Sequence, residues 1–200
     1  AELMLGDESY AGATSFYKFE SAVQRIFGFK HVIPTHQGRA AENVLFSYLV
    51  KPGMVVPGNA HFDTTKGHIE SRKAKAIDVT IDEAHDTQLE IPFKGNVSLE
   101  KLEKVLKENK GNVPFMVLTV TNNTVGGQPV SMENIKATCK LCHQYGVPVV
   151  MDSARFAENA YFIKTREKGY ADKTIKEIVR EMYEDVDAAT MSCKKDAIVN

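Results

Sequence analysis

An aspartate and a pair of lysines follow two separate apolar stretches of this chain, and together they indicate cofactor chemistry. The run Val149-Val150-Met151 ends in Asp152, and the apolar-leaning segment 186–191 leads to Lys194 and Lys195. In open α/β sheets, ligands bind at the carboxyl ends of the strands. A lysine there can form a Schiff base with pyridoxal phosphate, while an aspartate keeps the pyridine nitrogen protonated, so that the ring draws electrons. These residue types in this order predict a pyridoxal phosphate site.

Alternating helices and strands are predicted around these residues. Apolar residues at helical spacing predict helices over 16–27, from 38 onward, and over 98–109, 132–145 and 173–184. Short apolar runs predict strands over 31–34, 54–57, 76–81, 115–120, 147–151 and 186–191. Strands that alternate with helices in this way favour an α/β fold with a mostly parallel sheet flanked by helices.

The composition suits one globular domain and excludes several classes of partner. The 200 residues are 43% hydrophobic, which is enough to bury one core. With 25 basic and 26 acidic residues the net charge is −1, so no nucleic-acid partner is expected. No apolar run approaches the roughly 20 residues that span a bilayer, and residues 1–4 do not begin a signal peptide. We therefore expect a cytoplasmic protein without a membrane partner.

The string Cys139-Lys140-Leu141-Cys142-His143 matches the C-x-x-C-H pattern of haem attachment. It falls inside the helix predicted from Met132, for which Ser131 is the predicted N-cap. We therefore interpret the two cysteines as half-buried thiols on one helix and expect no haem. Three cysteines in the whole chain imply no disulfide framework either.

Five motifs stand in order along the chain, and together they carry a family resemblance. They cover Gly6 to Gly12, Pro34 to Arg39, Gly126 to Ser131, Pro148 to Lys164, and Ser192 to Lys195. The set resembles the β-eliminating lyase family, which includes tryptophanase and tyrosine phenol-lyase. The resemblance implies that residues 1–200 are an incomplete pyridoxal phosphate-binding large domain of the aspartate aminotransferase type (fold type I). The family's amino-terminal arm and carboxyl-terminal small domain would then lie outside these residues.

The resemblance assigns roles to the residues around the cofactor ring. Lys195 aligns with the Schiff-base lysine and Lys194 with its neighbour, although chemistry alone would accept the reverse. Asp152 aligns with the partner of the pyridine nitrogen. Arg155 and Asn123 align with residues that approach the ring hydroxyl. The ordinary alternatives are a solvated lysine pair, a helix cap, a salt bridge and a turn.

A second group of aligned residues belongs to the cofactor phosphate and to the face of the ring. Gln37, Gly38 and Arg39 stand at a predicted helix start, where backbone N–H groups and positive charge bind phosphate. Gly38 permits close backbone approach, and Ser192 would add its hydroxyl to the same phosphate. Phe62 aligns with the aromatic residue that stacks on the ring, its alternative being an ordinary core position.

Asp63 bears on the choice of substrate. The resemblance at this position is to tryptophanase, because tyrosine phenol-lyase has Thr there, and a carboxylate near the indole nitrogen would stabilise positive charge during indole release. Tyr10 aligns with a tyrosine that reaches the neighbouring subunit's active site and protonates the leaving group. The short link 49–53 instead resembles tyrosine phenol-lyase. We predict elimination of indole from L-tryptophan, giving pyruvate and ammonia, with the corresponding L-tyrosine reaction as the alternative.

Glu8 and Asn200 align with family ligands of a potassium-like monovalent cation, the first through its carboxylate and the second through its backbone carbonyl. The resemblance also implies a homotetramer with active sites shared between subunits. A hypothesis of another class is a cofactor-binding fragment without turnover. It arises because the family's substrate-carboxylate arginine belongs to the carboxyl-terminal domain.

Overall fold

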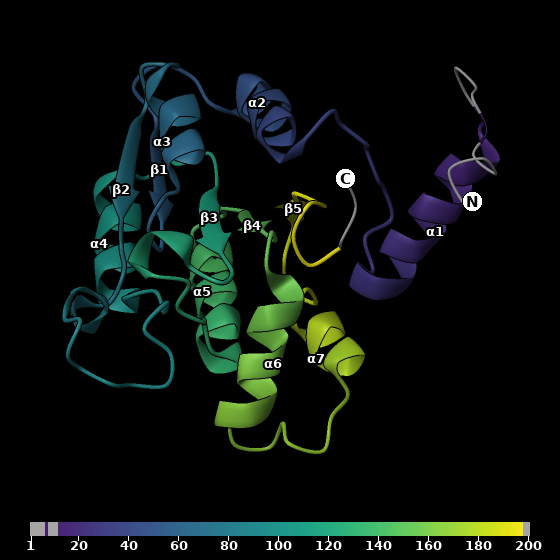
Figure 1. Cartoon of the computed structure of the whole chain (residues 1–200). Coiled ribbons are helices and arrows are strands. Elements are labelled where there is room, and N and C mark those ends of the chain that lie inside the picture. The colour runs from purple at the N-terminus through teal and green to yellow at the C-terminus, as the bar shows by residue number, and fades with distance from the viewer. Residues whose placement is uncertain (1–6, 8–11, 198–200) are drawn as a thin grey trace.

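Five short strands form one parallel sheet at the centre of the molecule (Figure 1). The computed structural model describes Asp7 and residues 12–197. The strands are β1 (Val55–Gly58), β2 (Lys75–Asp78), β3 (Met116–Thr119), β4 (Val149–Asp152) and β5 (Ala188–Thr190), in the spatial order β2-β1-β3-β4-β5. Every neighbouring pair is parallel, which confirms the predicted fold class. The register pairs Asp152 with Thr119 and with Thr190, so all three share the carboxyl edge.

Helices flank this sheet within the described part of the chain. They are α1 (Thr14–Phe27), α2 (Gly38–Leu49), α3 (Asp63–Glu70), α4 (Leu99–Glu108), α5 (Met132–Gln144), α6 (Phe156–Arg166) and α7 (Ile175–Met182), with short 3-10 turns η2 (Asp82–His85) and η3 (Asn123–Val125). Figure 1 shows α2 and α3 in the upper part of the view, with α3 beside β1 and β2, and α5, α6 and α7 together in the lower part. None of the described helices is long and apolar enough to cross a membrane.

The strands send alternate residues into two cores, because successive side chains of a strand face opposite sides of the sheet. The smaller core joins Val56, Val117 and Val150 to Phe46 of α2 and Ile69 of α3. The larger core lies between the sheet and helices α4 to α7. Its members include Val55, Met116, Leu118, Val149 and Met151 from the strands and Leu102, Ile135, Ile163 and Ile178 from the helices.

The predicted strand over 31–34 is wrong. This segment is an extended link between α1 and α2 that joins no strand among the described residues. Its apolar run is short, and Pro34 has no backbone N–H to donate to a sheet. Ile33 is 79% exposed, so this apolar residue packs against no sheet.

Two helices, α3 and α6, were not predicted. Helix α3 begins with Asp63-Thr64-Thr65 and contains Gly67, and Ile69 is its one buried hydrophobic residue, so its apolar stripe is weak. In α6 the run 160–163 is apolar without a gap, which obscures the helical period. Both helices follow a strand directly, as the crossover connections of a parallel sheet require.

The cysteine motif lies on a helix as predicted, but both thiols are fully buried rather than half-buried. Ser131 accepts a hydrogen bond from the N–H of Asn134 at 3.1 Å and so caps α5. Cys139 and Cys142 are buried on that helix, and burial raises the pKa of each thiol to about 12. His143 is paired with Asp187 rather than with the cysteines. The motif belongs to the core.

Candidate cofactor site

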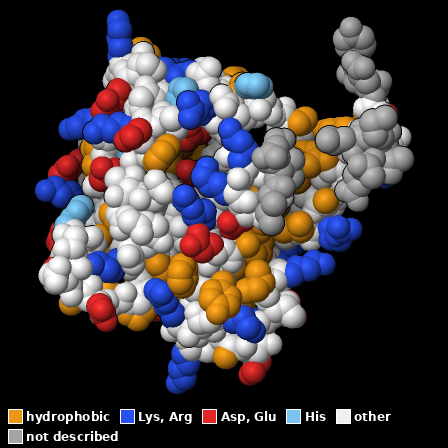
Figure 2. Space-filling view, viewed as in Figure 1, with side chains coloured by type: hydrophobic (Ala, Val, Ile, Leu, Met, Phe, Trp, Pro, Cys, Tyr) orange, Lys and Arg blue, Asp and Glu red, His pale blue; other side chains and the backbone are white. Residues whose placement is uncertain are grey.

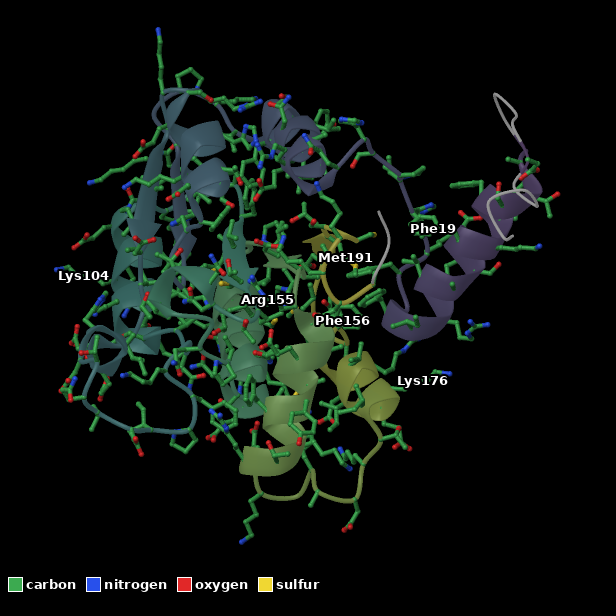
Figure 3. The ribbon with its side chains drawn as sticks, in the orientation of Figure 1. Phe19, Lys104, Arg155, Phe156, Lys176 and Met191 are labelled. Atoms are coloured by element: carbon green, nitrogen blue, oxygen red, sulfur yellow. The ribbon has the colours of Figure 1, made fainter. Side chains whose placement is uncertain are left out.

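The carboxyl ends of β4 and β5 open into a cavity of about 140 Å³. Segments from four places in the chain line it, and eight of the predicted cofactor residues are among the lining: Gln37, Gly38, Arg39, Phe62, Asp152, Ser192, Lys194 and Lys195. Figure 2 shows Lys and Arg side chains around a hollow near the middle of this face. In Figure 3, Arg155 and Met191 both lie in the middle of the molecule, where β4 and β5 end.

The amino terminus of α2 and the segment after β5 meet too closely for a side chain at residue 38. A Cβ added to Gly38 would lie 2.9 Å from Cβ and 3.1 Å from Cα of Ser192. Gln37, the N-cap of α2, makes no side-chain capping bond. The first N–H groups of a helix have no partner within it, and they attract anions. Ser192 lies beside this helix start, so its hydroxyl and the helix N–H groups are donors of the kind that a phosphate requires.

Asp152 ends β4 inside the cavity. Burial raises its pKa to about 6, and the negative charge of Glu42 adds to that rise. The charges of Lys195 and Arg155 act in the opposite direction. Because a carboxyl group held in this way gains most from a nearby cation, Asp152 is suited to pair with a protonated ring nitrogen.

Asp196, which the sequence analysis missed, caps the helix that follows β4. Its Oδ2 accepts hydrogen bonds from the N–H groups of Ala157 at 2.7 Å and Glu158 at 3.0 Å, both in the first turn of α6. The capping role that was the alternative for Asp152 therefore falls to Asp196. Since Asp196 directly follows Lys195, the same bonds anchor the lysine segment beside β4.

Asn123 and Arg155 are in contact, as neighbours of one cofactor group would be. Arg155 Nη1 donates to Asn123 Oδ1 at 2.9 Å. Arg155 also faces Glu158, with 3.8 Å between Nε and Oε2, so the alternative of a salt bridge holds as well. Phe62 precedes α3 and is 37% exposed, which leaves its ring free on the cavity wall. Asp63, the first residue of α3, is exposed and is not part of that wall.

Glu42 is a second residue that the sequence analysis missed. It is 6% exposed, lines the cavity, and accepts hydrogen bonds from the hydroxyls of Thr64, at 3.0 Å, and Thr65. These bonds join α2 to α3. Glu42 stands four residues after Gly38, a spacing that places both on one face of a helix. That spacing is the feature of the sequence from which Glu42 could have been predicted as a site residue.

A larger cavity of about 490 Å³ adjoins the first. Its apolar wall comes from α1, including Phe19 and Phe27, and from the link before α2. Ser192 and Lys194 line both cavities. Figure 3 shows Phe19 on α1 across from Met191 on the segment after β5.

Three predicted site residues, Glu8, Tyr10 and Asn200, lie outside the described residues. Within the described residues, no group of three or more His, Cys, Asp or Glu side chains is arranged to hold a metal ion.

The parallel sheet with this site at its carboxyl edge belongs to the pyridoxal phosphate-dependent fold type I class. The PLP-bound C–S lyase of Staphylococcus hominis, solved with L-cycloserine, superposes with a TM-score of 0.58 at 13% identity, over 76% of this chain and 37% of that chain. At that identity the likeness shows the fold alone. Residues 1–200 match the family model of the beta-eliminating lyases, and the chain belongs to that family.

Curated relatives agree with this assignment. The chain is 65% identical over 198 residues to a probable beta-eliminating lyase of Trichomonas vaginalis and 56% identical over 200 residues to a tryptophanase of Salinibacter ruber. It is 53% identical over 201 residues to a tyrosine phenol-lyase of Lacrimispora saccharolytica. These matches cover 99%, 100% and 100% of this chain but 43%, 42% and 43% of the relatives. The chain spans less than half the length of the proteins it matches.

Proposed function

We propose that the protein containing these residues is a pyridoxal phosphate-dependent carbon–carbon lyase that converts L-tryptophan to indole, pyruvate and ammonia. The observation that carries the proposal is the single cavity in which eight predicted cofactor residues from separate segments meet. We further propose that residues 1–200 form the cofactor-binding large domain, with an amino-terminal arm and a carboxyl-terminal small domain outside them.

The residues present fit the cofactor by shape and by charge. The close approach of Gly38 to Ser192 brings the start of α2 and a serine hydroxyl group into one corner, which suits a phosphate. Asp152, half-buried at a strand end with a raised pKa, suits a protonated pyridine nitrogen. Phe62 adds an aromatic ring to the wall of the same cavity. When bound, pyridoxal phosphate supplies an electron sink for carbanion chemistry.

The proposed roles of the chain's own residues follow from these positions. Lys195 would hold the cofactor through Nζ and would accept the α-proton of the amino acid on that same atom. Asp152 holds a proton on the ring nitrogen. Arg155 and Asn123 face the ring hydroxyl. Lys194 contributes positive charge beside Lys195, since both line the cavity.

The preference for L-tryptophan rests on the resemblance at Asp63, which is exposed and lies outside the cavity lining of the described residues. A carboxylate at the start of α3, next to the stacking residue Phe62, would stabilise positive charge on a departing indole, and Tyr10 would protonate it. L-tyrosine is the alternative substrate, because relatives of both kinds are similarly close, at 56% and 53% identity. The short link 49–53 supports that alternative. A cofactor-binding protein without turnover is the proposal of another class.

Three properties of the assembled protein are proposed from the family. Glu8 and the carbonyl of Asn200 bind a potassium-like cation, four subunits share active sites through Tyr10, and the protein is cytoplasmic.

Borohydride reduction of the full-length protein with pyridoxal phosphate, followed by peptide mass mapping, tests the proposal. A pyridoxyl group on Lys195 is expected, with Lys195→Arg as the variant that loses it. An adduct on Lys194 would transfer the role to that residue. Absence of a preferred adduct would overturn the function. Product analysis with L-tryptophan and L-tyrosine then separates indole release from phenol release.

A further inference from the structure

The four-residue loop that joins β1 to α3 is fixed more firmly than an ordinary loop. Asn59 is fully buried, and its Nδ2 donates to the carbonyl oxygens of Gly95 and Thr119 while its Oδ1 accepts from the N–H of Thr119. Ala60 has φ of 128°, a backbone conformation that side-chain-bearing residues seldom adopt. Such strain persists where the surroundings impose it, and it concentrates at functional sites.

His61, the next residue, is held through three polar groups. Its side chain is fully buried, and its ring Nδ1 lies 2.7 Å from Asp78 Oδ1. Its backbone N–H donates to the same oxygen at 2.9 Å, and its carbonyl accepts from Thr124 Oγ1 at 3.0 Å. The ring packs on Gly58, where an added Cβ would lie 2.8 Å from Nε2. Residue 61 is therefore fixed in both backbone and side chain.

The other ring nitrogen of His61 indicates that the ring is present for more than packing. Nε2 is buried and has no hydrogen-bond partner among the described residues. A buried polar atom without a partner lowers stability. An apolar ring would fill the same space without that loss, so the bond from Nδ1 to Asp78 is the property that distinguishes histidine here.

The residues next to this clamp are both predicted cofactor residues, although only Phe62 is in the cavity lining. Phe62 directly follows His61 and lines the cavity. Asn123 directly precedes Thr124 and accepts the hydrogen bond from Arg155. The bond between Thr124 and the His61 carbonyl thus joins the segment that carries the stacking ring to the segment that faces the ring hydroxyl.

We propose that His61, held by Asp78 and Thr124, is a positioning residue that sets Phe62 against the face of the cofactor ring and fixes Phe62 relative to Asn123. This inference rests on the proposed cofactor function and deepens it. The clamp touches no reacting atom. It acts through the placement of two residues that touch the cofactor.

The test compares this clamp with a matched pair elsewhere in the full-length protein. His61→Phe removes the ring bond to Asp78, and Thr124→Val removes the bond to the carbonyl while keeping the side-chain shape. His143→Phe is the control, because His143 Nε2 lies 2.8 Å from Asp187 Oδ2 in a similar pair away from the cavity. Each apoprotein is titrated with pyridoxal phosphate, and the circular dichroism of the bound cofactor is recorded.

We expect His61→Phe and Thr124→Val to weaken cofactor affinity about fivefold to tenfold, the size of an impaired aromatic stacking contact. The circular dichroism band of the bound cofactor should change as well, because it reports the orientation of the ring. His143→Phe should change neither quantity, although it lowers thermal stability. This pattern would establish the clamp.

The other outcomes separate the two proposals. A wild-type protein that binds no pyridoxal phosphate overturns the proposed function and the clamp with it. A wild-type protein that binds, with Thr124→Val and His61→Phe unchanged in affinity and dichroism, overturns the clamp and leaves the function standing. If His61→Phe fails to fold, the result for the isosteric Thr124→Val decides.

Discussion

The two edges of the sheet contain the same pair of side chains in different surroundings. At the carboxyl edge, Asp78 Oδ1 accepts from the ring and the backbone N–H of His61. At the amino end of β4, Asp187 Oδ2 faces the His143 ring at 2.8 Å and accepts from the N–H of Val149, also at 2.8 Å. The His61 side chain is 0% exposed and that of His143 is 41% exposed.

This difference shows which edge of the sheet holds its side chains rigidly. At the amino edge the pair ties the end of α5 to β4, and water reaches both partners. At the carboxyl edge the ring is buried beside the strained Ala60, and the next residue lines the cavity. The same hydrogen bonds serve assembly at one edge and the positioning of a site at the other.

The largest difference in effect between the candidate site and the rest of the molecule should come from substitutions of lysines. Lys195→Arg keeps the charge but loses the nucleophilic amine, so elimination should fall by about 10²–10⁴-fold or more. Lys104→Ala, on α4, should leave activity unchanged, because Lys104 faces Glu108 at 3.9 Å on an exposed surface. Steady-state assays of both variants measure the contrast, and equal losses would contradict it.

Two helical glycines give the next contrast. Gly38→Ala would force Cβ against Ser192, and such overpacking costs about 1–3 kcal/mol. Pyridoxal phosphate affinity should fall with it. Gly67→Ala in α3 meets no described atom within 4 Å and should stabilise the protein by up to about 1 kcal/mol. Chemical denaturation and cofactor titration distinguish the two, and a stabilised Gly38→Ala would rule out the tight corner.

Two acids at the carboxyl edge should respond to pH with opposite sign. Burial raises the Asp152 pKa from 3.8 to about 6. Between these two pH values the folded apoprotein therefore binds more protons than the unfolded chain. Stability should therefore fall by about 1–3 kcal/mol as pH rises from about 4 to about 6, and Asp152→Asn should remove that slope.

For Asp78, burial raises the pKa, but the hydrogen bonds from His61 together lower it by more than burial raises it. The net shift of the Asp78 pKa is therefore downward. The stability that Asp78 contributes is present above its unfolded pKa and is lost as pH falls through the lower folded pKa. Asp78→Asn should therefore flatten the acid side of the plot of stability against pH, because the amide does not titrate. Unfolding of the apoproteins across pH measures both effects. Matching profiles for Asp152→Asn and the wild type would show that Asp152 is not shifted.

The smallest contrast concerns two helix caps. Asp196→Ala and Thr174→Ala each remove an N-terminal cap, from α6 and α7 respectively, and each should cost about 1 kcal/mol. Of the two, Asp196→Ala should also reduce the yield of the reduced Lys195 adduct, because Asp196 anchors that segment. Equal adduct yields from both variants would show that the cap formed by Asp196 does not help to position Lys195.

The sequence predicted the parts of the site that local patterns mark. Apolar runs identify β4 and β5, and parallel strands bring their carboxyl ends together, so Asp152 and Lys195 were expected to meet. The resemblance added Gln37 and Phe62, which no periodicity distinguishes from a turn residue and a core residue. These residues do line one cavity.

Contacts that depend on the register between strands could not be predicted from the sequence. His61 meets Asp78 because β1 and β2 pair Gly58 with Asp78. A shift of one residue would turn Asp78 to the other face, and short strands give little pattern from which to choose. Asp196 bonds to a helix start that lies 38 and 39 residues earlier. Neither partner carries a local signal of the other.

The contact between Gly38 and Ser192 also has a consequence for how the protein acquires its cofactor. The two halves of the proposed phosphate corner are separated by 154 positions in the sequence, and Ser192 follows β5, the last strand of the part of the chain that the structure describes. Contacts between distant segments form late, because closing a long loop is entropically expensive. A nascent chain therefore cannot capture the phosphate until residue 192 has left the ribosome and β5 has joined the sheet. Loading of the proposed cofactor would then report that β5 has joined the sheet.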